Sequence, residues 1–259
     1  MAGEALREAL TELAAARERP YLDEDADREA AAGYYGEVEP TCEALSALLE
    51  STHRKRRRYK PAVELYPWVD LQPNGKLRSL YTGEEYAPEK LIEEAAQIEE
   101  RRAQLASPEQ EEAQEPYNCE HTVPQSWFRH KEPQRGDLHH LFTCEMKCNN
   151  FRASTPYTDF PDYLKVVREE CGKSERSGFE PWRGKGPAAR ATLYFTLRYP
   201  KLGKYSEEAL AHLLEWHGDD EVGEYERHRN ATIFERQGNR NPLIDHPEWA
   251  SEIDFTGGL

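Results

Sequence analysis

The stretch YNCEHTVPQSWFRHKEPQRGDLHHLFTCEMKCNNFRA, residues 117–153, decides how this chain folds. Aromatic residues, His, Cys and Asn replace here the Glu- and Ala-rich composition of the preceding residues. Residues 118–122 are a short extended run, residues 138–142 are a second one, and residues 144–153 are patterned as a helix of about three turns. The sequence therefore predicts a strand, a second strand and a helix that form one compact unit.

Side chains that can carry chemistry gather in this stretch. Four of the nine histidines fall within a twenty-residue window, namely His121, His130, His139 and His140. Hydrolysis of a phosphodiester needs a base for water, a cation that offsets charge in the transition state, and stabilisation of the leaving 3′ oxygen. A neutral imidazole suits the first task, and Glu and Asn oxygens are hard ligands that suit Mg²⁺. Glu120, His121 and Asn149 supply these parts without a nucleophilic Ser or Cys.

The adjacency of Glu120 and His121 imposes a structural condition. Successive residues of a strand point to opposite faces. The two side chains can therefore share a site only at a bulge or at a strand end, and we expect irregular backbone at this point.

Four ordered blocks resemble the bacterial endonuclease I family of ββα-metal (His-Me finger) nucleases. They are CEHTVPQSWF (119–128), GDLHHLF (136–142), CNNFR (148–152) and RNATIFERQGNRNPLIDHPEW (229–249), and the resemblance covers roughly residues 60–250. It implies an α+β, mostly helical single domain around a central ββα-metal motif. It also implies that His121 is the general base, that Glu120 and Asn149 bind the cation, and that Arg152 contacts phosphate.

The same resemblance implies an activity. We expect an endonuclease that depends on Mg²⁺ or another divalent cation, with weak sequence preference, and that leaves 5′-phosphate and 3′-hydroxyl ends. The expected substrate is double-stranded DNA, with RNA as a second candidate. One alternative is a zinc-stabilised module that binds nucleic acid without cutting it. Another is an interaction protein whose acidic N-terminal helices bind a basic partner.

Other residues near the motif have both a functional and a structural interpretation. His139 and His140 are expected to support the site, although His140 could equally fill a polar position in the core. Arg240, in GNRNP, is expected to fix a turn after the last helix by bonding to backbone, and a phosphate contact is the weaker interpretation. The resemblance also leaves open whether Arg129 or Arg135 clamps a phosphate.

The cysteines allow three interpretations. Cys144 and Cys148 are four residues apart, so on a helix they would share a face and could take two corners of a tetrahedral Zn²⁺ site. Cys171, with Cys119 or a nearby His, would complete it. The alternatives are buried free thiols, or a disulfide in an oxidising compartment. Because the chain shows no export signal, we favour the zinc and free-thiol interpretations.

The charge of the chain is unevenly distributed. Its 259 residues carry a net charge of -15, which alone argues against a polyanionic substrate. Residues 1–50, however, hold thirteen acidic and four basic residues, whereas residues 181–204 hold six basic residues and no acidic one. A second basic block, RKRRRYK, occupies residues 54–60. Such patches suit nucleic acid, although the second block could also be a solvated helix end.

The remaining sequence indicates how the chain is organised. We expect an acidic N-terminal helical segment over residues 1–58, punctuated by Pro20 and Pro40, and a nuclease domain over residues 59–259. A strand is expected at 77–81. Further helices are expected at 88–115, unless that stretch is a mobile excursion, and at 188–199, 206–217 and 221–236.

Membrane-spanning and export segments, which indicate the compartment of a protein, can be recognised in its sequence. No run approaches the roughly 18 apolar residues of a membrane helix. The first residues, MAGEALREALTELAAARERP, lack a basic start and a continuous apolar run, so we expect a cytoplasmic protein, or a secreted or periplasmic one if an upstream signal was removed.

Overall fold

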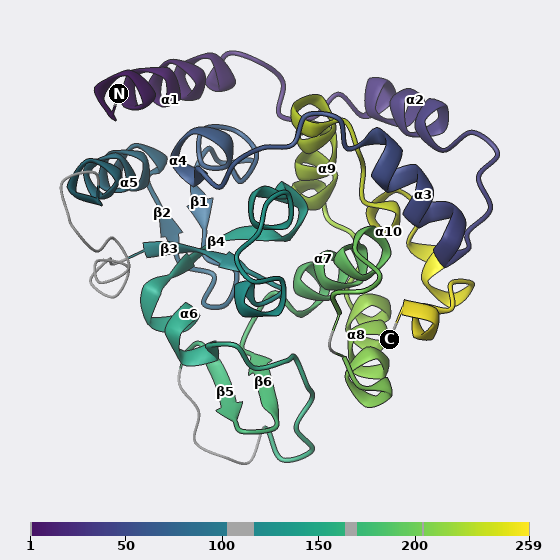
Figure 1. Ribbon diagram of the computed structural model, residues 1–259. Coiled ribbons are helices and arrows are strands. Elements are labelled where there is room, and N and C mark those ends of the chain that lie inside the picture. Colours follow the sequence, from purple (N-terminus) through teal and green to yellow (C-terminus); the bar gives the residue numbers. More distant parts are fainter. Residues whose placement is uncertain (1, 103–116, 164–169, 204, 259) are drawn as a thin grey trace.

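Strands β3 (Tyr117–His121) and β4 (Leu141–Glu145) pair antiparallel in the centre of the molecule and lead into helix α6 (Met146–Arg152) (Figure 1). We analysed a computed structural model, which describes residues 2–102, 117–163, 170–203 and 205–258. The predicted order of two strands and a helix is confirmed. The fold class, α+β and mostly helical in a single domain, is also confirmed.

The bounds of this unit differ from the prediction for a local reason. The second strand begins at Leu141, because Leu138–His140 form a 3₁₀ turn in which the Asp137 side chain accepts from the backbone amide of His139. Cys144 and Glu145 belong to β4, so α6 starts only at Met146. Strand pairing is regular through His121↔Leu141, so β3 contains no bulge at Glu120 and His121. Of the two expected alternatives, His121 lies at the strand end.

Helices surround this unit on most sides. The other described elements are α1 (Ala2–Arg17), α2 (Glu24–Tyr35), α3 (Cys42–Thr52), α4 (Pro61–Glu64), β1 (Leu77–Arg78), β2 (Glu85–Tyr86), α5 (Pro88–Arg102), β5 (Gly172–Glu175), β6 (Gly178–Pro181), α7 (Lys185–Arg198), α8 (Glu207–Asp219), α9 (Glu224–Gln237) and α10 (Pro242–Asp245). The helices expected at 188–199, 206–217 and 221–236 are thus confirmed as α7, α8 and α9. The strand expected at 77–81 is shorter, and the rest of 88–115 after α5 lies largely outside the described residues.

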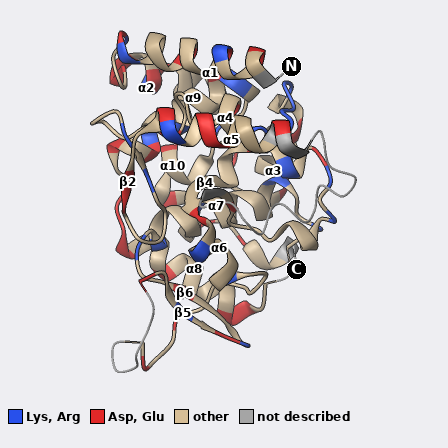
Figure 2. Cartoon of the chain, turned by 90° about the vertical axis from the view of Figure 1, so that its left-hand side faces the viewer, with Lys and Arg blue, Asp and Glu red and all other residues tan. Residues whose placement is uncertain are grey.

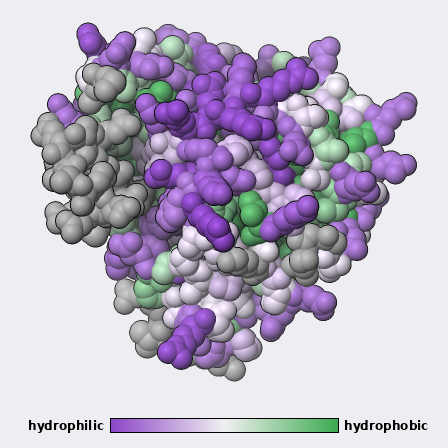
Figure 3. Space-filling model, viewed as in Figure 1, coloured by the Kyte–Doolittle hydropathy of each residue, from purple (hydrophilic) through white to green (hydrophobic). Residues whose placement is uncertain are grey.

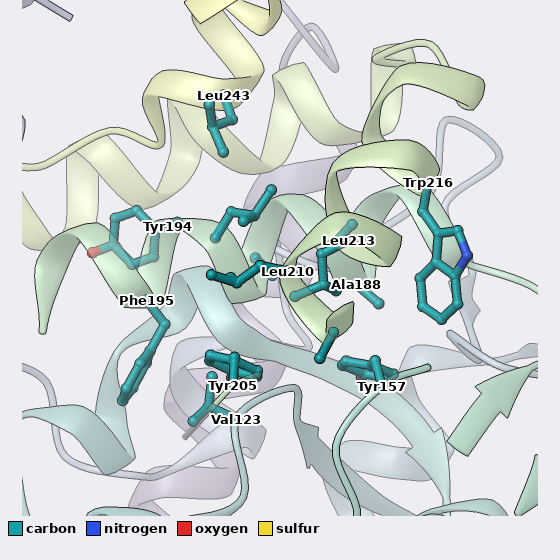
Figure 4. Close-up of a cluster of buried hydrophobic side chains, with 14 of the residues drawn as sticks. Val123, Tyr157, Ala188, Tyr194, Phe195, Tyr205, Leu210, Leu213, Trp216 and Leu243 are labelled. Atoms are coloured by element: carbon teal, nitrogen blue, oxygen red, sulfur yellow. The ribbon is translucent and has the colours of Figure 1, made fainter. Parts of the chain in front are cut away.

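Helix α7 is the centre of the larger hydrophobic core. It packs against α8 and α3, and nearly all of its side chains are buried. Figure 4 shows part of this core, in which Ala188 of α7 lies close to Leu213 of α8. A helix that is buried on all sides needs packing partners on all sides. Helix α7 also contacts the 3₁₀ turn Leu138–His140, so the core helps to position the turn that precedes β4.

The acidic N-terminal helices pack on the rest of the chain. Ala9 and Leu13 of α1 lie in a second core cluster with Leu65 and Leu91, and α1 contacts α4 and α5. Figure 2 shows acidic and basic residues interspersed over the side that carries α1 and α5. The apolar face of this segment therefore completes a core, and its charges lie mainly outside.

The cysteines are arranged differently from the expected zinc site. Cys148 and Cys171 form a disulfide with a Cα–Cα distance of 5.2 Å, which ties α6 to the start of β5. Cys119 and Cys144 are buried free thiols. Cys144 lies in a strand, so it does not share a helix face with Cys148, and the prediction of zinc at Cys148 and Cys171 is wrong. Across the described ranges, no three His, Cys, Asp or Glu side chains gather in a way that could hold a metal.

None of the described helices combines the length and the apolar character that a membrane crossing requires.

Candidate active site

Glu120 lies in β3 with its carboxylate fully buried. Its Oε1 accepts hydrogen bonds from the Tyr81 hydroxyl at 2.8 Å and from Nη1 of Arg152. Its Oε2 is also buried and has no partner among the described residues. Burial raises the pKa of Glu120 above the ordinary value, and the attraction of Arg152 opposes that rise. One carboxylate oxygen is therefore held by the protein, and the other is left for a ligand.

Arg152 holds the end of β3. Its Nη1 also donates to the carbonyl oxygen of His121 at 2.7 Å, and its Nη2 donates to that of Thr122 at 2.7 Å. The guanidinium lies 4.4 Å from the ring centroid of Tyr157, and the side chain is almost fully buried. These contacts leave it no access to a substrate, so the expected phosphate contact is not supported. Arg152 is instead a positioning residue.

His121 is the last residue of β3, and its ring orientation is fixed by one hydrogen bond. Its Nε2 lies 3.0 Å from the carbonyl oxygen of Arg135. A carbonyl can only accept, so Nε2 donates and Nδ1 carries the lone pair. Burial, together with repulsion from His140, lowers the pKa of His121 well below 6.5. The ring is therefore neutral near pH 7 and has a basic nitrogen.

Among the described residues, three aromatic rings lie around the imidazole of His121, and the Phe128 ring centroid is 6.3 Å away. The Tyr59 ring centroid lies 5.0 Å away, and that of His140 lies 5.3 Å away. His140 is itself held by a 2.6 Å contact between its Nε2 and the carbonyl oxygen of Gln134. His140 thus packs against the candidate base, and it also fills a buried polar position.

His139 points elsewhere. Its Nε2 lies 3.2 Å from the carbonyl oxygen of Asn239, and its ring packs on Tyr194 with 4.3 Å between centroids. Burial lowers the pKa of His139 to about 4, against the attraction of Asp137. The structure thus places His139 on the side of α7 and gives it no described contact with Glu120 or His121.

Asn149 lies in the interior of α6 and is partly exposed. Asn is often found as a helix cap, but the N-cap of this helix is Glu145, so Asn149 has no capping role at the start of α6. Asn149 precedes Arg152 by three residues, and residues three apart share a helix face. Because Arg152 reaches Glu120, Asn149 lies on the face of α6 that is turned toward β3.

Glu120 and Asn149 together fit a hard divalent cation. The unpartnered Oε2 of Glu120 is a carboxylate oxygen, and the Asn149 amide offers a second oxygen from the neighbouring helix. Mg²⁺ needs few protein ligands because it keeps several waters. The predicted ligand pair therefore remains chemically suitable.

Arg240 is fully buried, so its donors, including Nη1, which bonds none of the described residues, are not accessible to a phosphate. Its Nη2 donates to Asp27 at 2.7 Å and to Asp245 at 2.8 Å, and the side chain is fully buried. The expected structural role is correct, but the partners are carboxylates and not the backbone. The next residue, Asn241, caps α10 by accepting from the Leu243 amide at 3.0 Å.

Three contributors to the site were not predicted from sequence. Tyr81 holds Glu120, Tyr59 contacts His121, and the Arg135 carbonyl orients the imidazole. Tyr59 follows the basic block at 54–58, which is the only signal that could have pointed to it. A backbone carbonyl leaves no trace in the sequence.

Comparison with known proteins identifies relatives of this chain. The family model for endonuclease I matches residues 41–248. An extracellular ribonuclease of Bacillus subtilis (strain 168) is 33% identical over 135 residues, which cover 45% of this chain and 46% of that protein. An extracellular ribonuclease of Bacillus amyloliquefaciens is 32% identical over 140 residues, with the same two coverages of 45% and 46%. The chain thus spans about half the length of the curated relatives it matches.

Proposed function

Since this chain belongs to the endonuclease I family, we propose that it is a metal-dependent nuclease that hydrolyses phosphodiester bonds. The observation that carries this proposal is the orientation of His121. Its Nε2 is held by the Arg135 carbonyl, which leaves Nδ1 as the free nitrogen of a neutral ring. A neutral, oriented imidazole is suited to remove a proton from water at neutral pH.

The chain's own residues divide the reaction between them. His121 Nδ1 accepts a proton from the attacking water. Oε2 of Glu120 and the Asn149 amide would hold a divalent cation, which offsets charge on the phosphate and on the leaving 3′ oxygen when bound. Arg152 keeps Glu120 and the backbone of His121 in register. The products would be 5′-phosphate and 3′-hydroxyl ends.

The substrate includes RNA in this proposal. Sequence alone favoured double-stranded DNA, but both curated relatives are named extracellular ribonucleases. A site that acts on the phosphate and the 3′ oxygen uses atoms that DNA and RNA share. We therefore propose cleavage of both polymers with weak sequence preference.

The compartment in this proposal is an oxidising one. Disulfides persist outside the cytosol, and the Cys148–Cys171 bond lies next to the candidate site. The relatives are named as extracellular. We therefore prefer the secreted or periplasmic alternative to the cytoplasmic one. The non-cutting, zinc-stabilised module loses its main support because two of its four proposed sulfur ligands are bonded to each other.

A cleavage assay tests the proposal. Supercoiled plasmid and a structured RNA are each incubated with the protein in Mg²⁺, in EDTA, and after Mg²⁺ is restored in excess over EDTA. We expect cleavage of both polymers that EDTA stops and Mg²⁺ restores, with 5′-phosphate ends. If neither polymer were cleaved in Mg²⁺, Mn²⁺ or Ca²⁺, the proposed nuclease function would be overturned. Cleavage that EDTA does not affect would show that the reaction needs no metal.

A further inference from the structure

We propose that the segment joining α3 to α4 carries a strip of cations that binds the backbone of the nucleic acid beside His121. The strip consists of Arg54, Arg56, Arg58 and Lys60, and the inference rests on the proposed nuclease function. In Figure 1 the segment crosses from α3 to α4. Figure 3 shows strongly hydrophilic residues gathered over the upper middle of the same face.

The side chains of the strip are free to bind a ligand. All four residues are exposed. Within the part of the chain that the structure describes, no hydrogen bond or ion pair involves their side chains. The segment begins after the end of α3 at Thr52, so these cations are not the last turn of a helix. The solvated-helix-end interpretation is therefore wrong.

The basic residues of the other block, residues 181–204, differ from the strip because several of them are buried or paired with carboxylates. In α7, Arg190 is buried and bonds Glu226 through two nitrogens at 2.7 Å, and Lys185 bonds Asp159 and Glu180. Arg198 is also buried. Three of the six cations in residues 181–204 are therefore buried or paired within the fold, so this block does not form a continuous surface patch.

The residues between the strip members fasten the segment to the protein. Nε and Nη2 of Arg57 donate to the carbonyl oxygen of Arg236 at 3.1 and 2.9 Å. The backbone amide of Lys55 donates to the carbonyl oxygen of Gln237 at 3.2 Å. Odd-numbered residues thus hold the segment to the end of α9, while even-numbered residues present their charges to solvent.

The same segment is joined to the turn that orients the candidate base. The Glu132 carboxylate accepts from the backbone amide of Tyr59 at 3.2 Å and from that of Gly136 at 2.8 Å. Any side chain at position 136 would overlap the carbonyl oxygen of Arg57, so only glycine allows this approach. Gly136 follows Arg135, whose carbonyl holds His121. The strip is therefore fixed relative to the imidazole.

Tyr59 places the strip directly at the site. Its ring lies 5.0 Å from that of His121, and the Arg135 guanidinium lies 4.8 Å from the same ring. A polyanion that follows the strip would thus pass the imidazole. Phosphate contacts supply sequence-independent affinity, as a nuclease with weak sequence preference requires. On a chain of net charge -15, a free cationic strip also directs where such a polymer approaches.

A charge-matched pair of variants tests the strip. The strip variant carries R54Q, R56Q, R58Q and K60Q. The control carries R7Q, R17Q, R28Q and R176Q, which are exposed basic residues of α1, α2 and the β5–β6 turn. Binding of labelled duplex DNA and single-stranded RNA is measured in the His121→Ala background at several salt concentrations. For DNA, the strip variant should lose roughly 0.9 in the log–log salt slope for each phosphate contact removed, and about 3 to 4 in total.

Kinetics separate this inference from the proposed function. With His121 intact, the strip variant should lose kcat/KM on polymer but keep wild-type kcat/KM on bis(p-nitrophenyl) phosphate, which is too small to reach the strip. Equal salt slopes and equal polymer kinetics in the strip variant and the control would overturn the strip. A wild-type protein that binds polymer through the strip but cleaves neither substrate would overturn the nuclease and leave the strip in place.

Discussion

Arg152 donates to the carboxylate of Glu120 and, through the same nitrogen, to the backbone carbonyl of His121. One buried guanidinium therefore joins the candidate metal ligand to the candidate base. Because helix α6 carries both Arg152 and Asn149, its position is coupled to the positions of Glu120 and His121 in β3.

Replacement of Arg152 should act on stability first. Arg152→Met leaves the Glu120 carboxylate buried without its charged partner, and breaking a buried pair costs about 3 to 5 kcal/mol. Urea unfolding of the variant should show this loss, whereas Arg58→Met, an exposed change, should stay within about 0.5 kcal/mol. A variant of wild-type stability that only cleaves more slowly would instead support the original assignment of Arg152 to phosphate.

Removal of the His121 imidazole should abolish most cleavage. General-base catalysis contributes roughly 10² to 10⁴ in rate, so His121→Ala should lose kcat by that factor and still bind nucleic acid. His130→Ala is the matched control, because His130 is an exposed histidine of the same window. If His121→Ala cleaved at the wild-type rate, or if the control lost as much activity, the base would be another group.

Changes at the proposed metal ligands should shift Mg²⁺ affinity in opposite directions. Glu120→Gln removes a ligand charge and should weaken binding, whereas Asn149→Asp adds one and should strengthen it. Titration calorimetry with Mg²⁺ measures both, and circular dichroism checks that each variant is folded. Unchanged affinity in both folded variants would exclude the pair as ligands.

Acid should destabilise the protein through its buried histidines. His139 has an unfolded pKa near 6.5 and a folded pKa of about 4. The unfolded state therefore binds its proton first, and the stability from the neutral ring is present above pH 6.5 and is lost as pH falls toward 4. This loss amounts to roughly 3 kcal/mol for His139. Urea unfolding at pH 7 and pH 5 should show the fall, and it should be smaller in His139→Phe. If the folded His139→Phe variant showed the same pH dependence of stability as the wild type, His139 would not be a source of the acid destabilisation.

Loss of the disulfide should lower stability. Cys148 and Cys171 are separated by 23 positions, and closing a loop of this size contributes about 3 kcal/mol in the chain-entropy model. The double variant Cys148→Ser, Cys171→Ser should melt at a lower temperature than the wild type, and the wild type under reducing agent should match it. Cys42→Ser, at a free cysteine, is the control. A melting temperature that dithiothreitol does not change would show that the bond adds no stability.

Sequence reasoning located the ββα unit, and the reason is physical. Alternating and helical hydrophobic patterns are local. The positions of Glu120, His121 and Asn149 relative to these patterns can also be recognised along the sequence. The turn before β4 was misassigned, because the Asp137 side chain caps residues 138–140 as a 3₁₀ turn and competes there with the strand pattern. The strand therefore begins three residues later than predicted and α6 two residues later, which places Cys144 in the strand and not in the helix on which the zinc prediction depended.

The sequence by itself determined which residue types are available for chemistry and the order in which the central strands and helix follow one another. Only the tertiary structure decided what each charged side chain does, because burial and partners are set by segments far apart in the chain. Arg152, Arg240 and Arg190 are enclosed with carboxylates, whereas Arg54, Arg56 and Arg58 remain in solvent. The tertiary structure also decided which nitrogen of His121 is free, because the carbonyl that orients the ring comes from Arg135, fourteen residues away.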